Sequence, residues 1–230
     1  MATTKTTALC NETFRFFRDL GKNNNKPWMD ANRQRYQDSL VQPCRRLFEQ
    51  LVPSILQLDS NFDVSGRTGT NFSRINRDIR FAKDKTPYKT QMYLKFERPS
   101  PGDRESGQLY VGLTKDTVTV GFRIYSGGKR KESALALIAE PRVTSSPKWL
   151  TQQKKRLSGK FESYWYTTEK GEWTKHEGWP TDPTAWKRIQ AWIVRKKTTP
   201  AAATRATFAA EAVKTFRLLY PLLKFTSISS

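Results

Sequence analysis

Three segments in the middle of the chain decide the predicted fold: residues 92–96 read MYLKF, residues 109–113 read LYVGL and residues 118–124 read VTVGFRI. In each segment an apolar side chain recurs at every second position, which is typical of a strand that is buried on one face. Lys115 and Asp116 leave room for a tight hairpin between the last two segments. Pro99 and Pro101 mark a longer loop between the first two. These connections are too short for a crossover helix, so the sequence predicts an antiparallel sheet.

Helical patterns lie on both sides of these segments. On the N-terminal side, the spacing predicts one helix from Asn11, as N-cap, to Gly21, and a second helix from about Pro27 to Leu58 with a kink or restart at Pro43. On the C-terminal side it predicts four helices. The first contains Leu135 and Ile138 and stops near Pro141, and the second begins at Ser146-Pro147 and contains Leu150 and Leu157. The third begins at Asp182-Pro183 and contains Trp186, Ile189 and Ile193, and the last contains Phe208, Ala212, Phe216 and Leu219. This order predicts an α+β protein whose central antiparallel sheet carries packed N-terminal and C-terminal helices. We expect residues 1–10 to form a flexible tail and residues 11–225 to form a single domain.

Composition limits the class of protein. The chain has 230 residues, of which 37% are apolar, and its 41 Lys and Arg against 21 Asp and Glu give a formal net charge of +20. It contains no run near the roughly 20 apolar residues of a membrane span, and its start shows no secretory pattern. With Cys10, Cys44 and His176 as its only cysteines and histidine, the sequence predicts no metal site, no cofactor and no disulfide framework. A reducing, cytoplasmic location and no membrane partner are the expectations that follow.

The segment 74–89, RINRDIRFAKDKTPYK, concentrates charged and polar side chains. Its six cations and two carboxylates leave a local charge of +4. The candidate anion-binding residues are Arg74, Arg77, Arg80, Lys83, Lys85 and Lys89. Residues 83–89 at the end of this segment are predicted to form a tight basic loop, which can present ammonium groups, a hydroxyl and backbone N–H groups to a phosphate or a carboxylate.

Arg77 conflicts with the pattern of its surroundings. If residues 72–81 are extended, Arg77 shares one face with Ile75, Ile79 and Phe81. Removing the partner of a buried ion typically costs about 3–5 kcal/mol. Arg77 therefore requires a carboxylate, a bound anion or a bulge that turns it outward. Asp84, after the turn, is a candidate partner within reach, and Asp78 could pair only if the pleat is broken.

Two blocks of sequence resemble a known family. The run from Arg77 to Lys89 and the run Asn23-Asn24-Asn25-Lys26-Pro27-Trp28, followed by Ala31-Asn32-Arg33 and Arg35-Tyr36, are similar to the signature of the domain of unknown function 2461 family. The resemblance extends from about Phe14 to about Phe225. The family often has Asp-His-Pro where this chain has Asp182-Pro183, so no role of that histidine carries over. The resemblance implies no particular activity and supports the choice of site.

Three functions are compatible with the segment 74–89. The leading hypothesis is a basic binding module for a phosphate-bearing partner, such as a nucleic acid, a nucleotide or another polyanion. An alternative is an enzyme for a phosphorylated or carboxylated substrate, with Asp78, Asp84 or Tyr88 as acid or base. A second alternative is a non-catalytic scaffold in which Arg77 and Asp84 form a structural latch. The sequence does not specify the ligand or the oligomeric state.

A second group of residues combines aromatic rings with cations. Its aromatic members are Phe161, Tyr164, Trp165, Tyr166, Trp173, Trp179, Trp186 and Trp192, and the interleaved cations are Lys160, Lys170, Lys175, Lys187 and Arg188. Such rings either stack against the bases of a nucleic acid or complete a hydrophobic core. Both interpretations are open at the level of sequence.

Overall fold

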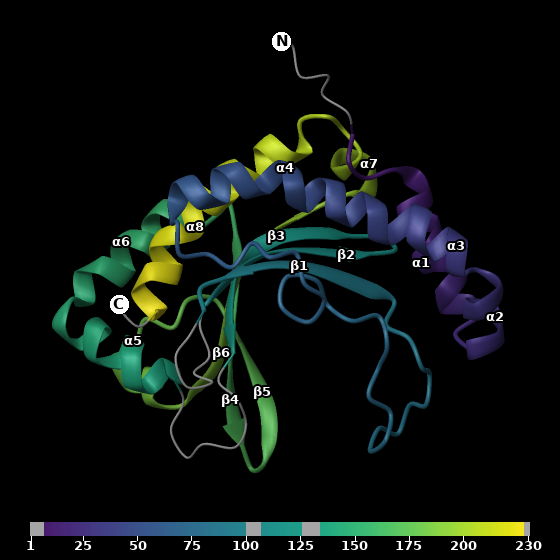
Figure 1. Cartoon of the computed structure of the whole chain (residues 1–230). Coiled ribbons are helices and arrows are strands. Elements are labelled where there is room, and N and C mark those ends of the chain that lie inside the picture. The colour runs from purple at the N-terminus through teal and green to yellow at the C-terminus, as the bar shows by residue number, and fades with distance from the viewer. Residues whose placement is uncertain (1–6, 100–106, 126–133, 228–230) are drawn as a thin grey trace, which may run out of the picture. The chain divides into compact units, whose positions relative to one another are not determined.

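The computed structural model describes residues 7–99, 107–125 and 134–227 (Figure 1). Within these residues, six strands form an antiparallel sheet in the order β1-β2-β3-β6-β4-β5, and the predicted α+β class is confirmed. The strands are β1 (Gln91–Glu97), β2 (Gln108–Thr114), β3 (Val118–Tyr125), β4 (Glu162–Glu169), β5 (Glu172–Glu177) and β6 (Ile189–Thr198). The helices are α1 (Asn11–Lys22), α2 (Lys26–Ala31), α3 (Arg33–Tyr36), the π-helical η1 (Gln37–Val41), α4 (Gln42–Leu58), α5 (Ala134–Ser145), α6 (Pro147–Leu157), the 3₁₀-helical η3 (Pro183–Lys187), α7 (Pro200–Ala203) and α8 (Phe208–Thr226).

The chain divides into two compact units. Unit 1 comprises Met1–Phe96, Val111–Thr119 and Lys197–Lys214, and unit 2 comprises Glu97–Tyr110, Val120–Lys196 and Thr215–Ser230. The expectation of a single domain over residues 11–225 stays a prediction. Residues 1–6 of the expected tail lie outside the described residues, whereas Ala8 and Leu9 are buried. Packing therefore begins before residue 10.

The core of unit 1 joins the N-terminal helices to β1. The alternate residues Met92, Leu94 and Phe96 of β1 are buried. So are the apolar residues at helical spacing in α1 and α4, namely Phe14, Phe17, Leu20, Cys44, Leu47, Leu51 and Ile55. Phe48 of α4 stacks on Phe96 with ring centroids 4.9 Å apart. The predicted restart near Pro43 is found, because η1 ends at Val41 and Pro43 lies in the first turn of α4, where a missing N–H is tolerated.

The core of unit 2 forms around two tryptophans. Trp186 and Trp192 are fully buried, with their ring centroids 5.3 Å apart. Trp192 also packs edge-on against Phe122 of β3. Helix α6 follows Ser146-Pro147 as predicted, and its Leu150 and Leu157 are buried.

Several predicted boundaries are wrong. Cys10, rather than Asn11, is the N-cap residue of α1. Helix α5 continues through Pro141 to Ser145, because the turn beyond the proline is held by buried Val143 and by Arg142, whose guanidinium donates to backbone carbonyls at the end of α8. The tertiary contacts of that last turn outweigh the one hydrogen bond that the proline removes.

The helix predicted from Asp182 to Ile193 is also wrong. Only Pro183–Lys187 is helical, and Ile189 and Ile193 belong to β6. A spacing of four residues fits one face of a helix and equally one face of a strand, since four is also a multiple of two. Strands β4 and β5 were not predicted at all, although Lys170 and Gly171 form a turn with positive φ between them.

Gly121 provides a test of how tightly the sheet of unit 2 is packed. A Cβ atom at this position would lie 2.6 Å from the carbonyl oxygen of Val194 and 2.8 Å from Cβ of Arg195. Because the first of these atoms is backbone, Gly121→Ala is expected to lower the free energy of unfolding by about 1–3 kcal/mol. Gly21→Ala is the matched control, since its Cβ would meet only Thr90 at 3.8 Å, inside a helix that favours alanine. Urea unfolding measures both, and equal stability of the two variants would contradict this packing.

Candidate functional site

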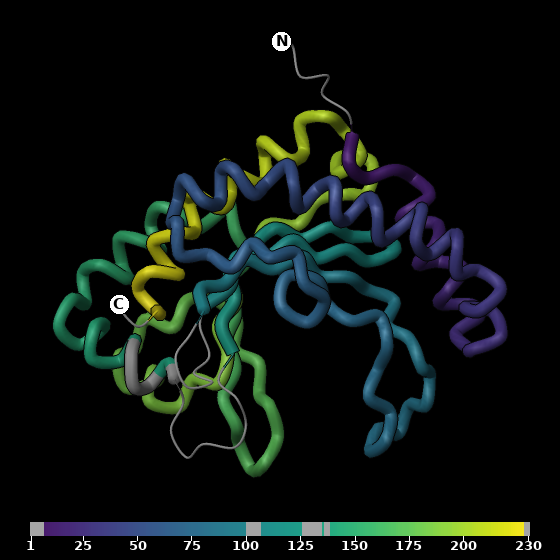
Figure 2. The backbone as a smooth tube through the Cα atoms, in the orientation of Figure 1, coloured from purple at the N-terminus to yellow at the C-terminus, as the bar shows by residue number. Residues whose placement is uncertain are grey.

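Residues Arg74–Lys89 form an irregular hairpin, which we call the basic hairpin. Its two runs are joined by hydrogen bonds from Arg77 N–H to the Pro87 carbonyl (2.8 Å) and from Lys89 N–H to the Ile75 carbonyl (2.7 Å). Figure 2 shows these runs as a narrow excursion of the chain that returns just before β1. Phe81 is 95% exposed, whereas Ile75 is buried. Ile75 and Phe81 would lie on the same face of a continuous strand over residues 72–81, so their different exposure shows that the hairpin is not such a strand.

A side chain from the second sequence block holds the base of the basic hairpin. The amide of Asn24 accepts a hydrogen bond from Tyr88 N–H (3.0 Å) and donates one to the Tyr88 carbonyl (2.9 Å). The ring of Tyr88 is buried. The two blocks that resemble one family thus contact each other directly, through residues 64 positions apart in the sequence.

Arg77 has the carboxylate partner that its surroundings require. It forms an ion pair with Asp84 and donates to the hydroxyl of Thr86. Asp84 also accepts from the backbone N–H of Thr86 (2.9 Å) and from its hydroxyl (3.0 Å). The pKa of Asp84 is lowered to about 2, and the hydrogen bond from the Thr86 N–H is the largest cause, followed by the Arg77 guanidinium.

The remaining candidate cations are not gathered around one point. Arg80 pairs with Asp78 two residues away, with a shortest N–O distance of 2.7 Å, and lowers the pKa of that carboxyl. Lys85 donates to the carbonyl of Ile79 (3.1 Å), and Lys83 is exposed. Arg74, exposed, and Lys89, partly buried, lie at the base of the hairpin, away from Phe81 in sequence. The exposed end therefore consists of Phe81 with Arg80, Lys83 and Lys85.

The carboxylates among the candidate catalytic groups are engaged in ion pairs, which suits a structural role better than acid–base catalysis. The lowered pKa values of Asp78 and Asp84 make both carboxylates poor proton acceptors at neutral pH. In the described ranges, no group of three or more His, Cys, Asp or Glu residues is placed to hold a metal ion.

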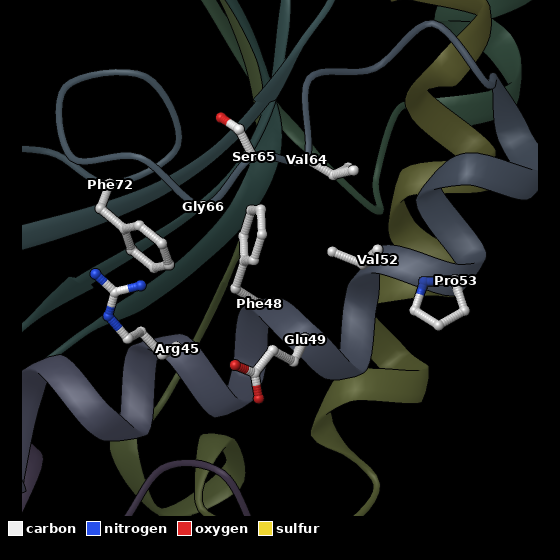
Figure 3. Close-up of a pocket in the computed structure, with 9 residues that line it drawn as sticks. All are labelled: Arg45, Phe48, Glu49, Val52, Pro53, Val64, Ser65, Gly66 and Phe72. Atoms are coloured by element: carbon white, nitrogen blue, oxygen red, sulfur yellow. The ribbon is translucent and has the colours of Figure 1, made fainter.

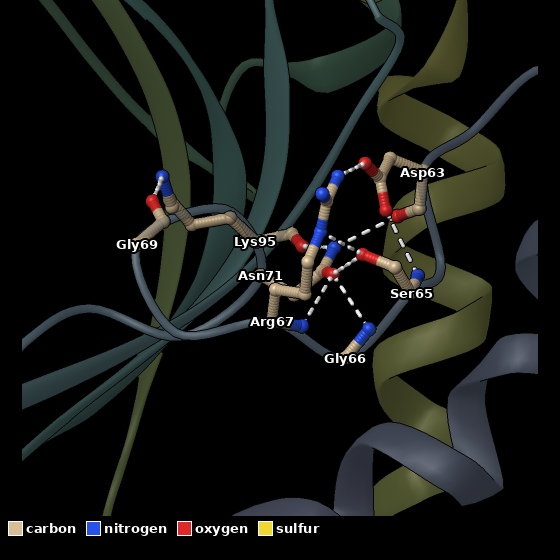
Figure 4. Close-up of polar contacts among 7 residues, drawn as sticks. All are labelled: Asp63, Ser65, Gly66, Arg67, Gly69, Asn71 and Lys95. Carbon is tan, nitrogen blue, oxygen red and sulfur yellow. Dashed lines mark hydrogen bonds and ion pairs between the residues drawn. The ribbon is translucent and has the colours of Figure 1, made fainter.

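Sequence analysis missed Asn71, which organises the loop that precedes the basic hairpin (Figure 4). Its side chain is fully buried. Its Oδ1 accepts from Gly66 N–H (2.8 Å), and its Nδ2 donates to the carbonyls of Asp63 (2.7 Å) and Lys95 (3.2 Å). Gly66 and Gly69 have positive φ in this loop, but a single asparagine in the sequence does not reveal which backbone groups it will satisfy.

A cavity of about 350 Å³ lies between α4 and this loop (Figure 3). The buried rings of Phe48 and Phe72 and the side chains of Val52 and Val64 form much of its lining. Arg45 lies at the side of the cavity, with its guanidinium carbon 5.4 Å from the centroid of the Phe72 ring. The cavity is mainly apolar, and Asn71 fixes the loop that closes it.

The fold and the hairpin define an α+β protein with a basic, aromatic-tipped loop. The model of the conserved hypothetical protein family DUF2461 matches residues 12–225, so this chain belongs to that family. Among curated proteins, no significant match was found. None of the helices in the described part of the chain is long and apolar enough to cross a membrane.

Replacement of Asn71 tests its role in the loop. Asn71→Ala is expected to lower the free energy of unfolding by roughly 1–3 kcal/mol, because it removes the side chain that bonds the partly buried backbone N–H of Gly66 and carbonyl of Asp63. Asn61→Ala is the control, because Asn61 is exposed in the same loop. Urea unfolding of both variants is the measurement. Asn71→Ala with wild-type stability would show that the network does not hold the loop.

The titration of Asp84 tests the geometry of the basic hairpin. We expect its carboxyl to titrate with a pKa of about 2, and Arg77→Gln to raise this pKa because one hydrogen-bond donor is lost. Since the pKa is lowered on folding, the stabilisation from Asp84 is present at neutral pH and is lost as the pH falls toward about 2. Carboxyl NMR resonances followed against pH give the value, with Lys22→Gln as the control. An unshifted Asp84 in the wild type would contradict the ion pair.

Proposed function

We propose that this protein binds nucleic acid through the exposed end of its basic hairpin. The observation that carries the proposal is the almost complete exposure of Phe81, which stands beside Arg80 and close in sequence to Lys83 and Lys85. An exposed phenyl ring gains free energy by stacking on a base, and neighbouring cations can contact the phosphates on either side.

The position of Phe81 is supported by the bonds that fix the chain around it. Asn24 holds the base of the hairpin at Tyr88, and Asp84 holds Arg77 in its middle. A ring presented by a constrained loop loses less conformational entropy on binding than a ring on a mobile one. In this proposal Arg77 and Asp84 shape the hairpin, and they do not contact the partner.

The cations at the exposed end remain accessible to phosphate. The ion pair between Arg80 and Asp78 joins two side chains that are 76% and 62% exposed. Exposed ion pairs of this kind are weak and are screened by salt. A phosphate group can therefore replace Asp78 as the partner of Arg80, and the net charge of +20 attracts a polyanion from a distance.

The two alternative functions have less support. An enzyme would use Asp78, Asp84 or Tyr88 as acid or base, but both carboxyls have lowered pKa values and the ring of Tyr88 is buried. A scaffold would use the contact between Arg77 and Asp84, but it gives no reason for a fully exposed phenylalanine at the end of the hairpin.

Binding of a labelled DNA oligonucleotide, followed by fluorescence anisotropy over a salt series, tests the proposal. We expect the logarithm of the binding constant to fall linearly with the logarithm of salt concentration. Phe81→Ala should weaken binding roughly tenfold, because base stacking on an aromatic side chain contributes about 1–3 kcal/mol. Lys83→Gln combined with Lys85→Gln should make the salt dependence shallower by roughly 1–2 in slope.

Lys22→Gln is the control, since it removes an exposed cation of unit 1 outside the hairpin. In the Lys22→Gln protein, Phe81→Ala should weaken oligonucleotide binding by the same factor as in the wild type. A wild-type protein that binds no oligonucleotide at low salt would refute the proposal. So would hairpin variants that bind with wild-type affinity and salt dependence.

A further inference from the structure

The strands of unit 2 divide the aromatic residues of the sequence between two faces. In the pairing of β4 with β5, Tyr166 lies opposite Lys175 and Thr168 lies opposite Trp173. Residues two apart on a strand, and residues directly opposite across a ladder, share a face. Tyr164, Tyr166, Trp173 and Lys175 therefore lie on one face of the sheet.

The opposite face carries the core of unit 2. Trp192 contacts Phe122 and Trp186 there, with centroid distances of 5.5 and 5.3 Å. Trp186 and Trp192 complete the core on that side. On the first face Tyr164 is buried with Ala191 and Ile193, and the partly buried Tyr166 packs against them, so only the rings at the margin of this cluster are exposed.

Exposed rings on the first face form a cluster. Trp173 is 51% exposed and Tyr125 is 40% exposed. Their ring planes are inclined by 30°, with centroids 6.4 Å apart, and Tyr166 lies 5.5 Å from Trp173. Single exposed apolar side chains are common on protein surfaces, whereas a contiguous group of large ones marks a binding surface.

Cations lie among these rings. Lys175 Nζ is 4.5 Å and the Arg195 guanidinium carbon 4.9 Å from the centroid of the Tyr164 ring, and Arg123 is 5.6 Å from that of Tyr125. We call Arg123, Tyr125, Tyr166, Trp173, Lys175 and Arg195 the aromatic face.

Glutamates accompany two of these cations. Lys175 pairs with Glu177, which is 74% exposed, and a surface ion pair of this kind contributes little and is easily exchanged. Arg195 is only 24% exposed, and its pairing with Glu162 compensates that burial. The sequence of unit 2 contains 20 Lys and Arg against 10 Asp and Glu. The resulting positive net charge attracts an anionic partner.

We propose that the aromatic face binds single-stranded nucleic acid. Bases stack on Trp173 and Tyr125, and the backbone phosphates contact Lys175 and Arg123. A single strand fits this surface because its bases are free to stack on protein rings, whereas those of a duplex are already stacked on each other. The surface shares no residue with the basic hairpin, so this inference goes beyond the function proposed above.

The test compares labelled oligothymidylate of about 12 nucleotides, a length within the usual range of single-strand sites, with a duplex and with an abasic oligomer of the same length. Trp173→Ala is expected to weaken binding of the single strand roughly tenfold and to leave binding of the abasic oligomer unchanged. Trp173→Phe should retain most of the affinity, because the ring is kept. Lys175→Gln should lower the salt dependence, and Lys148→Gln, at an exposed lysine of α6, should weaken binding less.

Leu218→Ala is the apolar control, since Leu218 is 39% exposed on α8 of the same unit. Circular dichroism and urea unfolding establish that each variant folds. Where Trp173→Ala fails to fold, the comparison of Trp173→Phe with Lys175→Gln decides, since a tenfold loss in Trp173→Phe or no loss in Lys175→Gln counts against the proposal.

The outcomes separate the two proposed surfaces. Weakening by Trp173→Ala that depends on the bases, and that adds to the effect of Phe81→Ala, supports the aromatic face. Wild-type affinity of Trp173→Ala for the single strand overturns it, even where the hairpin variants weaken binding. Equal binding of single strand, duplex and abasic oligomer also overturns it, because charge alone would then account for the interaction.

Discussion

Backbone groups in a long segment without regular structure must find hydrogen-bond partners, and this requirement shapes the region around the basic hairpin. Residues 59–90, between α4 and β1, contain no helix or strand, only isolated bridges. Side-chain amides and carboxylates take the place of the hydrogen bonds that a strand ladder would supply. Asn71, Asn24 and Asp84 accept from the backbone N–H groups of Gly66, Tyr88 and Thr86, respectively. Long loops fixed in this way are uncommon in compact proteins and are often functional.

The same requirement assigns different roles to side chains that look alike in the sequence. Arg77 and Arg80 both lie beside an aspartate, yet Arg77 is only 26% exposed and Arg80 is 76% exposed. The partner of Arg77 is needed to compensate its burial, whereas the partner of Arg80 can be exchanged at little cost. A structural role for Arg77 and the proposed binding role of Arg80 thus lie within one segment of sixteen residues.

The sequence predicts those elements in which the apolar residues follow a single repeat, either every second residue as in a strand or every third to fourth as in a helix. Strict alternation identified β1, β2 and β3, and the stripe of Phe208, Ala212, Phe216 and Leu219 identified α8. It failed where both faces of a strand carry large side chains, as in β4, or where a spacing of four fits two periods, as in β6. The charge of the hairpin was evident from sequence, but the role of Asn71 was not, because its partners are backbone groups that only the folded loop brings together.

Charge alone does not locate a binding site in this protein. Unit 1 carries 21 Lys and Arg against 11 Asp and Glu, and unit 2 carries 20 against 10, so the positive excess is the same in both. Such an excess attracts any polyanion and carries no information about orientation or strand state. Exposed aromatic rings are rarer and act only at contact distance. The two sites that we propose therefore rest on exposed rings, Phe81 in unit 1 and the pair of Trp173 and Tyr125 in unit 2, rather than on charge.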